Sequence, residues 1–182
     1  MARPQGMENW GASEFDLGDL GKKVSFIHLC AYPNEGNKGD DDSRPPTNHW
    51  AAFLQANGRG SIRFDMIPGD GADGLTGMLV IESKTYEFTN NATQRVSFAT
   101  LGQSTVQTIA DLVSRLGRDK YRFTENEEGC RYWIYTFISD LEGAGIVAAG
   151  SKGEAWDSLS RYWFHPPGSG SDAREVDEGT FL

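Results

Sequence analysis

The residues of this sequence best suited to chemistry are one cysteine and one histidine on different structural elements. Cys130 follows Gly129 and opens a segment whose apolar residues recur at helical spacing, so its thiol is expected in the first turn of a helix. The unpaired N–H groups and the macrodipole at a helix start favour the nucleophilic thiolate. Such a nucleophile needs a base. His49 begins an expected strand and can reach a helix start that packs across the sheet, which predicts acyl-transfer chemistry of the Cys/His type.

A third polar group is expected to orient the imidazole and stabilise its charged form. On the strand that returns after His49, the residues Ser61, Arg63 and Asp65 alternate onto one face. Asp65 is the best candidate because a carboxylate also stabilises imidazolium, and Gln55 or Asn48 could serve instead. Backbone N–H groups at the helix start would form the oxyanion hole. The reaction would be hydrolysis of an amide or ester, or transfer of the acyl group to an amine.

Other features oppose this chemistry and leave two further functions open. Three carboxylates before the helix, Glu125, Glu127 and Glu128, favour its dipole but raise the pKa of a nearby thiol. A buried free cysteine is also commonly inert. One alternative is therefore a cyclase or isomerase that works without a covalent step in an aromatic pocket. The other is a binding module without catalysis. The expected substrate-binding side chains are Trp50, Arg63, Arg131, Tyr132 and Trp133.

The elements that must position these residues follow a strands-first order. Period-two alternation predicts strands over residues 23–32, 49–55, 61–67, 76–83 and 94–100. Helical spacing then predicts helices over 104–116, with Ser104 as N-cap, over 129–142 and over 153–163. This order is typical of an α+β domain, here a single antiparallel sheet of about five strands followed by two to three packed helices. We expect one domain over 21–165, with a flexible arm at 1–20 and a flexible tail at 166–182.

Composition excludes several partner classes. The net charge of −9 over 182 residues disfavours binding to nucleic acid or to an anionic membrane, since both need a positive field. No apolar run approaches the roughly 20 residues of a membrane helix. The first residues lack the pattern of a signal peptide, so a cytoplasmic location is expected.

Cofactors are not indicated by any motif. Cys30 and Cys130 provide no disulfide framework and are expected as free thiols. The chain has no phosphate loop, no CxxC pair and no HExxH, so neither a metal nor a nucleotide cofactor is predicted. The expected partner is a small-molecule substrate, and five tryptophans with a sheet edge leave room for a homodimer.

Two short motifs resemble a known fold. The segment HWAAFL at residues 49–54, followed by a turn and a second strand, is similar to the His-Trp hairpin of circularly permuted papain-like folds, including NlpC/P60 and lecithin:retinol acyltransferase-like families. In those families the cysteine comes later, at a helix start before an aromatic-rich stretch, as in GCRYW at 129–133. The resemblance covers about residues 48–142 and implies a permuted papain-like fold with a cysteine nucleophile. The third polar residue of those families often falls at the level of Ser61 and Arg63, neither of which is a usual orienting group.

A second resemblance covers more of the chain. The segments NHWAAFL and GRDKYRFTENEEGCRYWIYTFISDLE look like those of an uncharacterised family of small fungal proteins. This resemblance brings no mechanism with it. It implies a role in natural-product biosynthesis, because small proteins of this kind can lie near biosynthetic genes.

Overall fold

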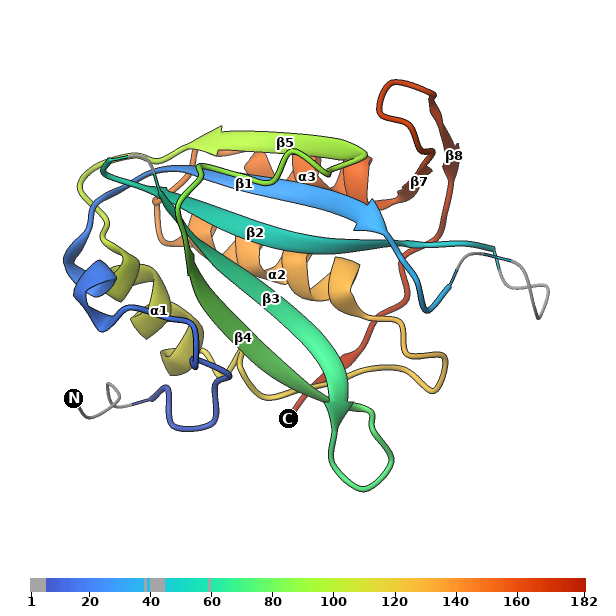
Figure 1. The fold of residues 1–182 in the computed structure, drawn as a ribbon, viewed down its shortest axis with the longest axis horizontal. Helices are drawn as coiled ribbons and strands as arrows, with labels where there is room; N and C mark the ends of the chain where they lie inside the picture. The colour runs from blue at the N-terminus through green and yellow to red at the C-terminus, as the bar shows by residue number, and fades with distance from the viewer. Residues whose placement is uncertain (1–5, 38, 40–44, 59) are drawn as a thin grey trace.

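Five long strands form most of one curled antiparallel sheet in the computed structural model (Figure 1). The structure describes residues 6–37, 39, 45–58 and 60–182. Successive side chains of each strand point to opposite faces of the sheet. The long strands are β1 (Val24–Pro33), β2 (Asn48–Ala56), β3 (Ser61–Asp70), β4 (Thr76–Lys84) and β5 (Gln94–Ala99). Each lies within a few residues of its predicted position.

The sheet is wider than predicted, because two short strands extend it. Its order is β5-β1-β2-β3-β4-β6-β9, so it has seven strands rather than about five in the described part of the chain. The added strands are β6 (Tyr121–Arg122) and β9 (Thr180–Phe181). Two-residue strands are too short to produce a detectable alternation. A separate ribbon pairs β7 (Arg161–Trp163) with β8 (Ser171–Ala173). The α+β class is confirmed.

Three helices follow the long strands, as predicted. They are α1 (Val106–Arg115), α2 (Cys130–Gly143) and α3 (Ser151–Leu159), and a short 3-10 turn, η1 (Leu17–Gly21), precedes them. Thr105 rather than Ser104 caps α1, by accepting from the backbone N–H of Thr108. The third helix is shorter than predicted, because the chain turns into β7 after Leu159. The apolar spacing of Trp156 and Trp163 there imitates a longer helix.

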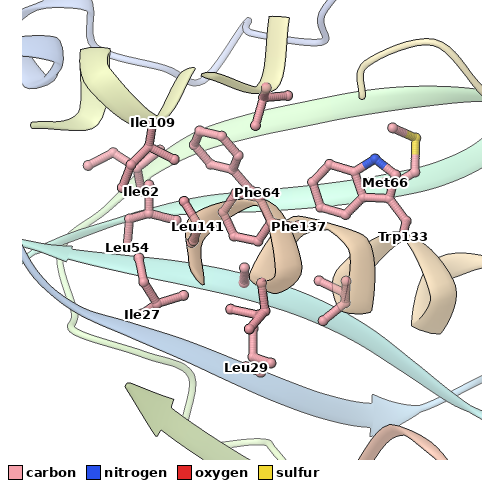
Figure 2. Close-up of a cluster of buried hydrophobic side chains, with 14 of the residues drawn as sticks. Ile27, Leu29, Leu54, Ile62, Phe64, Met66, Ile109, Trp133, Phe137 and Leu141 are labelled. Carbon is pink, nitrogen blue, oxygen red and sulfur yellow. The ribbon is translucent and has the colours of Figure 1, made fainter. Parts of the chain in front are cut away.

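The core lies between the inner face of the sheet and α2, which lies behind β2 and β3 (Figure 1). Figure 2 shows Leu29, Leu54 and Phe64 of the sheet facing Phe137 and Leu141 of the helix, and all five are buried. The rings of Phe64 and Phe137 stack with centroids 6.0 Å apart. This packing fixes the position of α2 and therefore the place where Cys130 begins it.

The two ends of the chain are held rather than flexible over their described residues. Met7 and Trp10 are each 2% exposed and belong to the core, and the Trp10 indole N–H donates to Asp119 at 3.1 Å. At the other end, β9 pairs with β6, and the Phe181 ring packs 4.8 Å from that of Tyr121. Both ends, predicted as a flexible arm and a flexible tail, therefore contact the core at these residues. Their few apolar residues are spaced irregularly, so only long-range contacts show that they are buried. No helix of the described chain is long and apolar enough to cross a membrane.

Candidate active site

Cys130 lies where β2 and β3 separate. β2 pairs with β1 from Asn48 to Ala56, but with β3 only from Ala52 to Gln55. Figure 1 shows the two strands diverging beyond this point, with α2 behind them. The Cys130 sulfur lies 3.9 Å from the backbone oxygen of Asn48. It also accepts a hydrogen bond from the backbone N–H of Trp50. The thiol therefore lies beside the part of β2 that does not pair with β3.

The start of α2 depends on a glycine in a conformation that other residues avoid. Gly129 has φ 152°, and a Cβ there would lie 3.0 Å from the Tyr121 hydroxyl oxygen and 3.2 Å from the Phe123 ring. The Tyr121 hydroxyl donates to the Gly129 carbonyl oxygen at 2.9 Å. The glycine therefore allows β6 to pack directly against the residue that precedes the thiol.

Replacing Gly129 with alanine is expected to lower the free energy of unfolding by about 1–3 kcal/mol, because the backbone is strained and the Cβ collides with two rings. Urea unfolding followed by tryptophan fluorescence measures the loss. The matched control is Gly143→Ala at the end of the same helix, where a Cβ meets nothing within 4 Å. That variant should be neutral or slightly stabilising. Equal losses in the two variants would contradict this account of the helix start.

His49 and Asp65 meet across β2 and β3 on the outer face of the sheet. The His49 Nε2 lies 2.6 Å from Asp65 Oδ1, and the Asp65 side chain is 2% exposed. The other carboxylate oxygen of Asp65 accepts from the Arg63 guanidinium, which also donates to Glu82 at 3.2 Å. Tyr32 stacks on the imidazole with centroids 6.5 Å apart. Asp65 is therefore held from two sides, and it fixes the orientation of His49.

The hydrogen bonds favour an ion pair between His49 and Cys130. Burial opposes a charged imidazole, but its hydrogen bonds to Asp65 and to Cys130 raise the pKa of His49 to about 10. Burial likewise opposes a thiolate, yet the neighbouring His49, the Trp50 N–H and the Arg131 charge together lower the pKa of Cys130 below its usual value. Because Asp65 is bonded to Nε2, Nδ1 is the ring nitrogen left for proton exchange with the thiol. Both shifts act in the direction of a thiolate beside an imidazolium.

A cavity of about 180 Å³ opens beside the pair. The first backbone hydrogen bond within α2 is donated by Trp133 to the Gly129 oxygen at 3.0 Å. The N–H groups of Cys130, Arg131 and Tyr132 precede it, and such groups at a helix start can stabilise a negative oxygen. The cavity is lined by Asn34, Gly36, Asn37, Thr47, Asn48, His49, Pro68, Phe123, Asn126, Glu127, Glu128, Gly129, Cys130 and Arg131.

Of the residues expected to bind substrate, Arg131 alone lines this cavity, and its guanidinium is already bonded to the backbone oxygens of Leu159, Arg174 and Glu175. Arg63 holds Asp65 instead. Tyr132 lines a separate hollow of about 560 Å³.

Trp50 and Trp133 are core residues, 0% and 1% exposed, because their positions in β2 and α2 point between sheet and helices. The other two candidates for orienting His49 are engaged elsewhere. Gln55 bonds His28 Nε2 at 2.8 Å, and Asn48 bonds the backbone of Trp163.

Most of the cavity residues that sequence reasoning missed lie in loops, and Pro68 lies near the end of β3. Asn34, Asn37 and Thr47 come from the connection between β1 and β2, where Asn34 donates to the Thr47 hydroxyl at 3.0 Å. Loops have no periodicity that could reveal which side chains face a cavity. Within the described residues, no group of three or more His, Cys, Asp or Glu side chains is arranged to hold a metal ion.

Comparison with known proteins identifies a family but not a function. No curated protein and no solved structure matches the chain. A family model described as a domain of unknown function, DUF7770, matches residues 27–182, a range that contains β2, β3 and α2 with the three residues His49, Asp65 and Cys130. Since this match covers most of the sequence, the chain belongs to the DUF7770 family.

Proposed function

We propose that this protein is a cysteine-dependent acyl-transfer enzyme that hydrolyses a small amide or ester or transfers its acyl group to an amine. The observation that carries the proposal is the Asp65–His49 hydrogen bond on β2 and β3 beside the Cys130 thiol, which lies at the start of a helix. In this arrangement Cys130 is the nucleophile, His49 the acid and base, and Asp65 the group that orients the imidazole.

The proposed reaction has two steps. The Cys130 thiolate attacks the carbonyl carbon, and the carbonyl electron pair moves onto the oxygen, beside the N–H groups of the helix start. When that pair returns, the C–N or C–O bond breaks, and His49 donates its Nδ1 proton to the leaving atom. Water or an amine then attacks the thioester, His49 takes the proton of the attacking group, and the thiolate leaves.

The order of these residues supports a relation to circularly permuted papain-like folds. His49 on a hairpin comes first and Cys130 on a helix follows, and Asp65 supplies the orienting group a little further along the hairpin than Ser61 and Arg63. The resemblance to small fungal proteins favours a cytoplasmic enzyme of natural-product biosynthesis with a small-molecule substrate.

A second function is favoured by the hollow of about 560 Å³ beside α2 and α3. Tyr132, Tyr135 and Trp156 line it, and Cys130 does not. An apolar molecule bound there would make the protein a binder or a non-covalent enzyme. Such binding would change the fluorescence of Trp156 and would persist after Cys130→Ala.

Alkylation by iodoacetamide tests the proposed function. We expect the rate at Cys130 to level off at a pH below the ordinary thiol pKa of about 8.5. Cys30 is the internal control, because burial raises its pKa to about 12 and it is 0% exposed, so it should stay unlabelled in the folded protein. Mass spectrometry of the two cysteine peptides between pH 5 and 9 gives both rates. A Cys130 rate that levels off only at pH 8.5 or above would be that of an ordinary or a buried thiol and would contradict the proposal.

A further inference from the structure

The segment of residues 174–181 is bonded to the start of α2 on both sides of the thiol. On the preceding side, the Arg174 guanidinium donates to the Glu128 carboxylate. On the following side, the Arg131 guanidinium donates to the backbone oxygens of Arg174 at 3.0 Å and of Glu175 at 2.7 Å. The side chains that flank the thiol are therefore both fixed by one distant part of the chain.

A tyrosine hydroxyl makes a third link between this segment and the helix start. The backbone N–H of Gly179 donates to the Tyr121 hydroxyl oxygen at 3.0 Å. That hydroxyl donates in turn to the Gly129 carbonyl oxygen at 2.9 Å, and Tyr121 is 0% exposed. The residues around Cys130 are thus held by the 174–181 segment, directly or through this hydroxyl.

The charges in this contact balance one another. Glu128 and Arg131 are 7% and 3% exposed, and Arg131 Nη2 lies 3.6 Å from Glu128 Oε2. Arg174 adds a second cation, and Asp177, which hydrogen-bonds Glu128, adds a second carboxyl group. Removing one partner of a buried ion pair is strongly destabilising, because it leaves the other charge uncompensated. The cluster therefore holds the segment firmly against the helix start.

We propose that Arg131 and the 174–181 segment position the Cys130 thiol for reaction. They hold the sulfur beside His49 and keep the N–H groups of the helix start in place. This inference rests on the proposed acyl-transfer function and assigns the groups that hold its nucleophile. Arg131 suits the role because its guanidinium joins α2 to the segment and to the Leu159 carbonyl at the end of α3. A displacement of about 1 Å at a reacting group can cost about 100-fold in rate.

Replacing Arg131 with lysine tests positioning separately from charge. Lysine keeps the positive charge beside the thiol but lacks the planar fork with which arginine reaches oxygens in separate parts of the chain. Iodoacetamide labelling of Cys130 should level off at a pH about one unit higher than in the wild type. Labelling at pH 6.5 should slow by about threefold or more, since the more basic thiolate is also more nucleophilic. The matched control is Arg118→Lys, which loosens two hydrogen bonds to Asp140 near the other end of α2 and should leave the profile unchanged.

Replacing Tyr121 with phenylalanine tests the link through the hydroxyl, because it removes one oxygen atom and keeps the ring. The profile should shift in the same direction as in Arg131→Lys, and labelling at pH 6.5 should slow by about twofold or more. Its control is Tyr86→Phe, at an exposed tyrosine in the connection between β4 and β5, which should have no effect.

Labelling of Cys30 reports whether each variant is folded, since this thiol is 0% exposed in the native protein. If Arg131→Lys exposes Cys30, Tyr121→Phe decides alone. Exposure of Cys30 in both variants would overturn the inference, because these residues would then hold the whole fold rather than the thiol. Wild-type profiles in both variants, with Cys30 protected, would overturn it and leave acyl transfer intact. An ordinary thiol profile in the wild type would instead overturn the proposed function, and the inference with it.

Discussion

Replacing His49 with glutamine should reduce turnover by about 100- to 10,000-fold, the usual range for loss of a general acid and base. Before a substrate is known, the alkylation of Cys130 reports the same loss. Without the imidazolium, only the Trp50 N–H and the Arg131 charge still oppose the effect of burial, so the pKa of Cys130 should rise. The pH profile of alkylation should move upward accordingly. At pH 6.5 the rate should fall by about tenfold or more, even though a more basic thiolate is intrinsically more nucleophilic.

The control for this variant is His165→Gln, an exposed histidine in the connection between β7 and β8. It should leave the alkylation profile unchanged. A His49→Gln protein whose Cys130 keeps the wild-type profile would show that the helix start ionises the thiol by itself. In that event His49 would not be the base of the proposed mechanism.

Replacing Asp65 with alanine should lower the free energy of unfolding by about 3–5 kcal/mol, because it leaves Arg63 and His49 without their shared carboxylate in a buried place. The matched control is Glu82→Ala, which removes the other carboxylate bound to Arg63 from a more exposed position and should cost about 1 kcal/mol or less. Urea unfolding at pH 5.5 measures both. Losses of similar size in the two variants would show that Asp65 does not hold the site together.

The difference in the free energy of unfolding between the wild type and Asp65→Ala should also shrink at both low and high pH. Burial opposes ionisation of Asp65, but His49 and Arg63 lower its pKa, so its contribution is present above the unfolded value of about 3.9 and is lost as the pH falls through the folded one. The pKa of His49 is raised to about 10, so its contribution is full below about 6.5 and is lost as the pH rises toward 10. The destabilisation should therefore be largest between about pH 4 and 6.5. A difference that stays constant from pH 3 to 10 would contradict the assigned charges.

The sequence predicts the regular elements and fails where contacts alone decide the structure. The long strands and α2 are visible because their alternation and helical spacing persist over many residues. The two residues of β6, and Trp10 in the N-terminal segment, have no such pattern, so their burial depends on contacts with distant residues.

In the candidate site, too, the sequence predicts the residues that lie on regular elements better than the contacts that they make. His49, Asp65 and Cys130 could be named because each lies on a regular element whose face the pattern indicates, and the structure brings the three together. Trp50 and Trp133 were expected at the substrate because of their type, yet the same alternation and spacing turn them into the core.

The placement of every helix except η1 after the long strands has a consequence for synthesis on the ribosome. The inner face of the sheet, with Ile27, Leu54 and Phe64, is complete once β5 has been made, but α2 ends roughly 40 residues later. At a rate of roughly 5–20 residues per second, this apolar face lacks its cover by α2 for several seconds. A nascent chain in that state exposes an apolar surface that is prone to aggregation. Chaperones that bind exposed apolar strands would prevent this aggregation. The thiol chemistry cannot begin before this interval ends, because Cys130 reaches His49 only when α2 docks.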